Sequence, residues 1–159
     1  MTSKRWDRRA LEGLPLKLLI ISLLLSLTAP AVLKCMDSYE STTSRSLVLA
    51  EARRIVTTIE EVQTAGEGNR RTITVTLPPE RVQSSLALEI GGPLGNPSSM
   101  SVRCLCQGRV VSTLVLEDPP ARVTAVGGSP LRLEAGYHHL TVSYEFKDGQ
   151  SVITVAVTG

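Results

Sequence analysis

Aromatic residues and histidine are scarce in this chain of 159 residues, which has one tryptophan, three tyrosines, one phenylalanine and two histidines. Nucleic-acid-binding surfaces combine basic patches with aromatic rings on which bases stack. Residues 1–34 carry a net charge of +4, whereas residues 35–159 carry −2. The part of the chain long enough to form a domain is therefore slightly acidic, which argues against nucleic acid as a partner.

Catalytic motifs are absent as well. The sequence contains no G-x-S-x-G elbow, phosphate-binding P-loop, H-E-x-x-H motif or dinucleotide fingerprint. The only histidines, His138 and His139, are neighbours, and successive residues of a strand point to opposite faces. They do not converge with Cys104 and Cys106 into the four-ligand set that zinc needs. We predict that the protein is not an enzyme and has no catalytic residue, cofactor or metal.

The cysteine count is odd, with Cys35, Cys104 and Cys106. The last two lie in "RCLCQG", and side chains two apart on a strand share one face. Their Cβ atoms are too far apart along the strand for a disulfide to close easily. We therefore expect Cys104 and Cys106 to be small buried apolar residues.

The long apolar run at 14–33 is interrupted only by Lys17 and by three hydroxyl residues, Ser22, Ser26 and Thr28. About 20 apolar residues are enough to cross a bilayer core. Basic residues precede the run and a polar body follows it, so the positive-inside rule places the N-terminus in the cytoplasm. We predict a single-pass signal anchor in the cell membrane, with residues 35–159 outside the cytoplasm.

Two other fates fit parts of the same run. The basic "KRWDRR", the apolar segment and "APA" at 29–31 also have the form of a secretory signal that is cleaved after Ala31. Lipidation of Cys35 fits less well, because Lys34 stands where a lipoprotein signal has a small residue. The long polar N-terminal region and the helical pattern after Cys35 favour a retained anchor.

Residues 38–65 lack proline and glycine and have the periodicity of an amphipathic helix. Glycines at 66 and 68 suit the end of that helix, and the threonine-rich 41–46 favours a break or a flexible joint near the membrane. Apolar residues spaced alternately four and three apart form one face, which we call the helix stripe: Val48, Ala52, Ile55, Ile59 and Val62. The stripe packs on the protein's own domain or, as a heptad-like alternative, on another chain.

After residue 68 the period changes from helical spacing to two. In "RTITVTL" the apolar residues alternate with threonines, which is typical of a half-buried strand. Asp148-Gly149 is a strong signal for a two-residue hairpin. The expected strands are 71–77, 85–90, 100–106, 109–117, 122–126, 131–134, 138–146 and 151–157.

These segments predict an α+β protein. The plan comprises a basic cytoplasmic head (1–13), a transmembrane helix (14–34), an amphipathic helix or stalk (35–68) and an extracytoplasmic, antiparallel β-sandwich-like domain (69–159).

An N-terminal apolar helix that continues as an amphipathic helix into a β domain resembles the type IV pilins and pseudopilins. The stretches "LEGLPLKLLIISLLLSLTAPAV", "IEEVQTAGEGNRRTITVTLP" and "LEAGYHHLTVSYE" are similar to a group of small archaeal pilin-like membrane proteins. The resemblance implies processing after Ala10 or Gly13 and packing of the apolar helix against other subunits. The fifth position of the processed chain would be Pro15 or Leu18, where pilins have a glutamate that docks the neighbouring subunit.

Two classes of function remain. In the first, the protein is a structural or assembly subunit of a surface filament or secretion system, and its partners are the membrane and other pilin-like or envelope proteins. In the second, it is a membrane-tethered or secreted binding module whose loops at 91–99 and 117–120 meet a ligand. We favour the first, because a mere tether does not need an amphipathic continuation.

Overall fold

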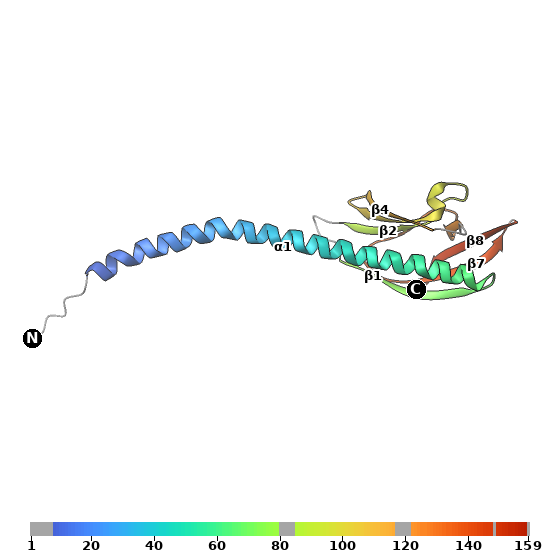
Figure 1. Ribbon diagram of the computed structural model, residues 1–159, viewed down its shortest axis with the longest axis horizontal. Coiled ribbons are helices and arrows are strands. Elements are labelled where there is room, and N and C mark those ends of the chain that lie inside the picture. Colours follow the sequence, from blue (N-terminus) through green and yellow to red (C-terminus); the bar gives the residue numbers. More distant parts are fainter. Residues whose placement is uncertain (1–7, 80–84, 117–121, 148, 159) are drawn as a thin grey trace, which may run out of the picture. The chain divides into compact units, whose positions relative to one another are not determined.

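The computed structural model describes residues 8–79, 85–116, 122–147 and 149–158. The chain divides into two compact units, Met1–Thr42 and Thr43–Gly159, and each is considered by itself. The helix α1 (Arg8–Ala65) supplies the first unit and the beginning of the second, and strands form most of the rest (Figure 1). The α+β class predicted from the sequence is confirmed.

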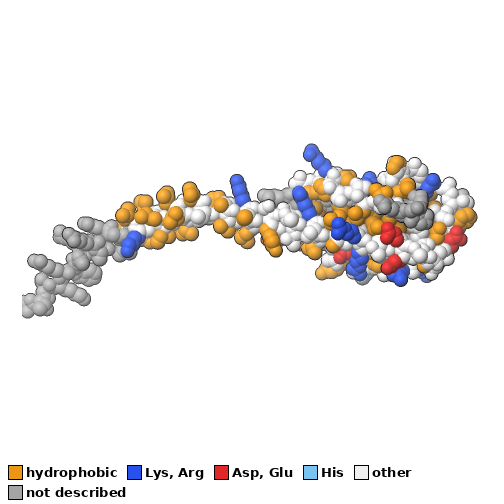
Figure 2. All heavy atoms as spheres, viewed as in Figure 1, with side chains coloured by type: hydrophobic (Ala, Val, Ile, Leu, Met, Phe, Trp, Pro, Cys, Tyr) orange, Lys and Arg blue, Asp and Glu red, His pale blue; other side chains and the backbone are white. Residues whose placement is uncertain are grey.

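In the first unit, α1 exposes its apolar side chains. The leucines, isoleucines and valines between residues 16 and 33 are all exposed, and hydrophobic side chains cover this part of the helix (Figure 2). The hydroxyls of Ser22, Ser26 and Thr28 donate to carbonyls three or four residues earlier, so these polar groups are satisfied within the helix. This segment is long and apolar enough to cross a membrane.

The threonine-rich stretch does not break the helix, so the expected break at 41–46 is wrong. The hydroxyls of Ser41 and Thr42 donate to the carbonyl of Ser38, and the Ser46 hydroxyl donates to the carbonyl of Thr43. These bonds run back along the helix instead of replacing its backbone ladder, which is how hydroxyl residues are accommodated inside helices.

The helix stripe lies in the core of the second unit. Its five residues have at most 1% of their surface exposed, and they join one apolar cluster with residues from the strands. The helix ends where Gly66 adopts a φ of +91°, a left-handed conformation that glycine reaches without strain. The Asn69 side chain donates to the freed carbonyls of Ala65 and Gly66.

The strands form two four-stranded sheets, with the orders β1-β7-β8-β5 and β4-β3-β2-β6. Each strand begins and ends within two residues of the sequence prediction. Their bounds are β1 (Arg70–Leu77), β2 (Leu86–Ile90), β3 (Ser101–Cys106), β4 (Arg109–Val115), β5 (Arg122–Ala125), β6 (Leu131–Leu133), β7 (Gly136–Lys147) and β8 (Gln150–Val157). One short 3-10 helix, η1 (Pro97–Met100), interrupts the expected loop at 91–99.

Strand pairing departs from the all-antiparallel prediction at one place. β5 pairs with β8 in parallel, whereas the other pairings between described strands are antiparallel. β5 is reached by a crossing from the other sheet and is not joined to β8 by a hairpin, so hairpin geometry does not set its direction. β7 and β8 do form the predicted hairpin, since Lys147 pairs with Gln150 and Gly149 has a φ of +75°. Asp148 lies outside the described residues.

The C-terminal part of α1 packs between the two sheets. Figure 1 shows it running between β1 and the layer of β2 and β4, and the core cluster joins the helix stripe to Val75 of β1 and Leu88 of β2. Arg54 donates to the carbonyl of Thr74 on β1 at 3.1 Å, and Arg71 forms an ion pair with Glu61. The helix thus covers the edge strand β1, which would otherwise present unpaired backbone groups. Residues 43–65, which belong to the amphipathic helix or stalk expected at 35–68, are therefore part of the second compact unit.

This packing predicts unequal costs for two similar truncations on α1. Ile55 is fully buried, whereas 52% of the surface of Leu47 is exposed. Ile55→Ala should lower the free energy of unfolding by about 2–5 kcal/mol, because it removes core contacts and leaves a cavity. Leu47→Ala, the matched control, should change it by less than about 0.5 kcal/mol. Urea unfolding of the full chain in mild detergent measures both, and equal effects would contradict the packing described here.

Candidate functional site

The two histidines point to opposite faces of β7 and contact different partners. His139 lies opposite Thr74 on one face of β7, where its Nδ1 is 3.1 Å from the threonine hydroxyl. His138 faces the other way, and its Nε2 is 2.7 Å from the Glu134 carbonyl. Within the described ranges, no three His, Cys, Asp or Glu residues come close enough together to hold a metal ion.

The cysteines are free thiols in three different environments. Cys104 is buried, Cys106 is half-buried and Cys35 is exposed. Cys104 and Cys106 pair with Leu88 and Leu86 of β2, so they share the core-facing side of β3 as expected. Burial raises the pKa of the Cys104 thiol.

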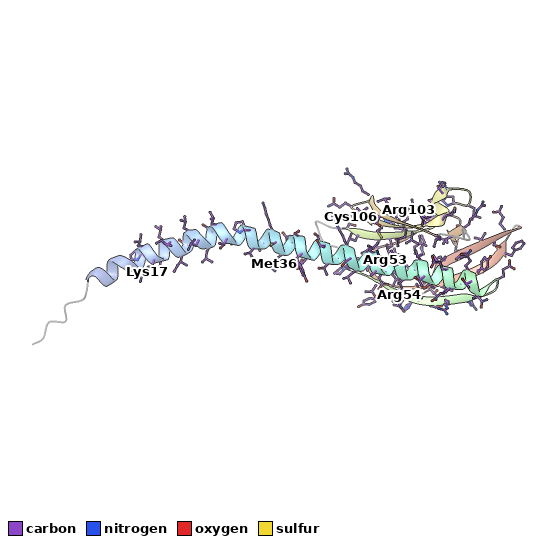
Figure 3. The ribbon with its side chains drawn as sticks, in the orientation of Figure 1. Lys17, Met36, Arg53, Arg54, Arg103 and Cys106 are labelled. Atoms are coloured by element: carbon purple, nitrogen blue, oxygen red, sulfur yellow. The ribbon has the colours of Figure 1, made fainter. Side chains whose placement is uncertain are left out.

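A notch between α1 and β4 lies beside these cysteines. The Arg45 guanidinium reaches to 4.0 Å from Cys106 Sγ (Cys106 is labelled in Figure 3). The register between β3 and β4 shifts beside the notch. Cys104 pairs with Ser112 and Leu105 pairs with Val110, so Val111 is an additional residue in β4 and forms a β-bulge. The notch has a volume of about 180 Å³. Its walls are mainly apolar, and among the described residues that line it only Arg45 and Ser112 offer a polar group to orient a ligand.

A wider hollow lies on the outer face of β7, β8 and β5, away from the core. It has a volume of about 650 Å³, within the range of ligand sites. Hydroxyl residues from these three strands line its floor, and Leu94 and the turn at 126–128 form its wall. This hollow has the size and polar lining of a binding site.

The loop at 91–99, singled out from the sequence as a recognition loop, is held firmly against β5. The Gly92 amide donates to the Val123 carbonyl at 3.1 Å. Gly91 has a φ of +66°, and a Cβ at that position would lie 2.2 Å from the same carbonyl oxygen, so a larger residue does not fit. The Asn96 side chain caps η1 by accepting from the Ser98 amide. These bonds fix Leu94 at the edge of the hollow.

Other residues predicted from the sequence have different positions. The helix stripe lies in the core and is not available to another chain. Ala31 lies in the exposed part of α1, and Ala10 and Gly13 lie in its first turns, where only the backbone is described. The loop at 117–120 lies outside the described residues. The floor of the hollow was not predicted, although the sequence holds its signal: Thr141 and Ser143 alternate with Val142 and Tyr144, and Thr154 stands between Ile153 and Val155.

The thiol environments predict an order of reaction with iodoacetamide at pH 8. The raised pKa of Cys104 keeps its thiol protonated, and burial blocks access, so it should react more slowly than Cys35 by about 100-fold or more. Cys106 should fall between them. Peptide mass spectrometry of the folded protein measures the order, with the protein in urea as the control in which the differences disappear. Equal rates for Cys104 and Cys35 in the folded protein would contradict the structure.

Comparison with known proteins shows a family for this chain. No curated protein and no solved structure matches the chain significantly. The family model described as "Domain of unknown function (DUF7311)" matches residues 22–158, which include the end of the apolar run, the helix stripe and the described strands. Because the match covers most of the sequence, the chain belongs to the DUF7311 family.

Proposed function

We propose that the protein is a non-enzymatic, pilin-like subunit that is anchored in the cell membrane and contributes to a surface filament or secretion assembly. The observation that carries this proposal is the difference in burial between the two parts of α1. Its apolar residues before position 34 are exposed, whereas its helix stripe is buried in the β domain. One helix therefore supplies both a surface that needs lipid or protein around it and a part of the domain core.

The length of α1 supports an assembly role over a simple tether. About 20 apolar residues suffice to cross a bilayer. Here the helix extends over 58 residues, and its continuation is an element of the domain. Subunits that assemble through apolar helices need such a direct connection between the packing helix and the head.

The charge distribution supports the proposed topology. Lys4, Arg5, Arg8 and Arg9 precede the apolar run, and only Lys17 lies within it. Under the positive-inside rule this arrangement keeps the N-terminus in the cytoplasm and places residues 35–159 outside. The Lys17 side chain is long enough to reach the interface from within the run.

A membrane-tethered binding module is the second candidate function, and the hollow on the outer face of β7, β8 and β5 favours it. The same module would be secreted if the chain were cleaved after Ala31. Association of the anchors distinguishes the assembly role from both forms of this alternative, because only assembly requires helices from different chains to touch.

Cysteine crosslinking in native membranes tests the assembly role. Leu24 and Leu27 are exposed on α1, with 56% and 77% of their surface accessible. In a Cys35→Ser, Cys106→Ser background, Leu24→Cys or Leu27→Cys should give dimers and higher ladders, or bands with a partner, on mild oxidation. These products are expected because close helix packing brings the thiols within disulfide distance.

Two matched controls accompany that experiment. The background protein without a new cysteine should stay monomeric. Thr76→Cys, on the exposed outer face of β1, tests for random collisions between heads. Only monomer from both helix variants, at native expression, would contradict the assembly role.

A further inference from the structure

The floor of the hollow carries a row of hydroxyls that crosses three strands. Ser143 of β7 pairs with Thr154 of β8, and Thr154 pairs in turn with Thr124 of β5. Residues directly opposite one another in a sheet point to the same face, and neighbouring strands are about 4.8 Å apart. The three hydroxyls therefore form a regular line across the outer face.

This row has unused hydrogen-bonding capacity. Within the described part of the chain, Thr154 has no side-chain partner, and Ser143 makes only long contacts, at 3.4 Å to Glu145 and 3.5 Å to the Thr154 carbonyl. Thr141, which also lines the hollow, is already paired, since its hydroxyl lies 2.7 Å from that of Thr158 and 3.2 Å from that of Thr72. Thr124 is buried, and its hydroxyl donates to the Ala125 carbonyl at 3.3 Å. Thr154 and Ser143 are therefore the hydroxyls of the row that keep hydrogen-bonding capacity for a ligand.

Two aliphatic side chains form an apolar rim on the wall of the hollow. Leu94 and Val126 stand at its edge with 49% and 73% of their surface exposed. Leu94 belongs to the loop held against β5 by the Gly92 amide, and Gly127 and Gly128 leave the backbone of the turn open to close approach. A ligand in the hollow would meet hydroxyls below it and aliphatic groups at its side.

The charges of the lining limit the class of ligand. None of the described residues lining the hollow is Lys or Arg, and Glu145 is acidic, so a phosphate or an acidic polymer would find no countercharge. The nearby Arg122 is already bonded to the Gln150 side chain at 2.7 Å. A peptide strand usually binds by adding to a sheet edge, but β7 and β8 have neighbours on both sides. At the edge strand β5, the Val123 carbonyl already accepts from the Gly92 amide, and the Ala125 amide donates to the Ser129 carbonyl.

We propose that this hollow binds a neutral, hydroxyl-rich glycan chain. The hydroxyls of Ser143 and Thr154 and the Glu145 carboxylate exchange hydrogen bonds with sugar hydroxyls, and Leu94 and Val126 pack against the apolar faces of the rings. Recognition of this kind needs both polar floor and aliphatic rim, and the outer face of the sheet supplies both. The site does not depend on assembly through the apolar helix.

Calorimetric titration of the full chain in a zwitterionic detergent without a sugar headgroup tests the proposal. The probes are linear neutral hexose oligomers (maltohexaose, cellohexaose and mannohexaose), with inorganic phosphate and an extended threonine-rich peptide as comparisons. At least one oligosaccharide should bind saturably. Thr154→Val, which keeps the shape of the side chain and removes its hydroxyl, should weaken that binding about 3- to 10-fold, as loss of one hydrogen bond does.

Three further variants make the result decisive. Ala156→Phe should abolish binding by filling the hollow, and Thr154→Ser should restore most of the affinity that Thr154→Val loses. Thr76→Val removes a hydroxyl from the same sheet face outside the hollow and should have no effect. Melting temperatures show that each variant is folded. The proposal is overturned if no oligosaccharide binds, if the peptide or phosphate binds in its place, or if folded Thr154→Val and Ala156→Phe bind as well as the original protein.

Discussion

Burial of the helix stripe between the two sheets is the interaction on which the rest of the fold depends. Ile55, Ile59 and their neighbours take the place that side chains of a facing sheet would occupy in a closed sandwich. The sheets do not have to close on each other along this side, because the helix fills the space. The edge strand β1 is then protected by Arg54 and by the Glu61–Arg71 ion pair and does not need another strand.

The same arrangement decides which surfaces are available for function. Because the inner faces of both sheets pack against α1 and each other, the outer face of the sheet that holds β1 and β7 carries the polar residues of those alternating strands. Inside the hollow, Ser143, Thr154 and Thr124 are small and hydroxylated, and the docked loop at 91–96 forms a wall beside them. The apolar part of α1 is the other exposed surface, so anchoring and recognition would involve different parts of the chain.

Much of the fold follows from periodicity in the sequence, while strand order and the hollow do not. The three-and-four spacing of the helix stripe and the period of two in "RTITVTL" specify which side chains are buried, and the structure has them buried in the same way. Periodicity assigns a face to each residue but no partner to each strand, so the parallel direction of β5 and the additional residue Val111 in β4 were not predictable. Thr154 reads as an ordinary solvent-facing residue until pairing sets it between Ser143 and Thr124. The break expected within the helix at 41–46 does not occur, because the hydroxyl bonds to Ser38 and Thr43 accommodate residues of low helix propensity.

The central claim is that the apolar part of α1 stays on the mature protein, where it holds the β domain at the membrane. Intact-mass spectrometry of the protein purified from its native host tests this directly. The account predicts a mass that includes residues 14–33, either from the complete chain or from a chain that starts at Leu11 or Leu14 after prepilin-type processing. A mature chain that starts at Val32 would contradict it, because signal-peptidase cleavage after Ala31 would have removed the anchor.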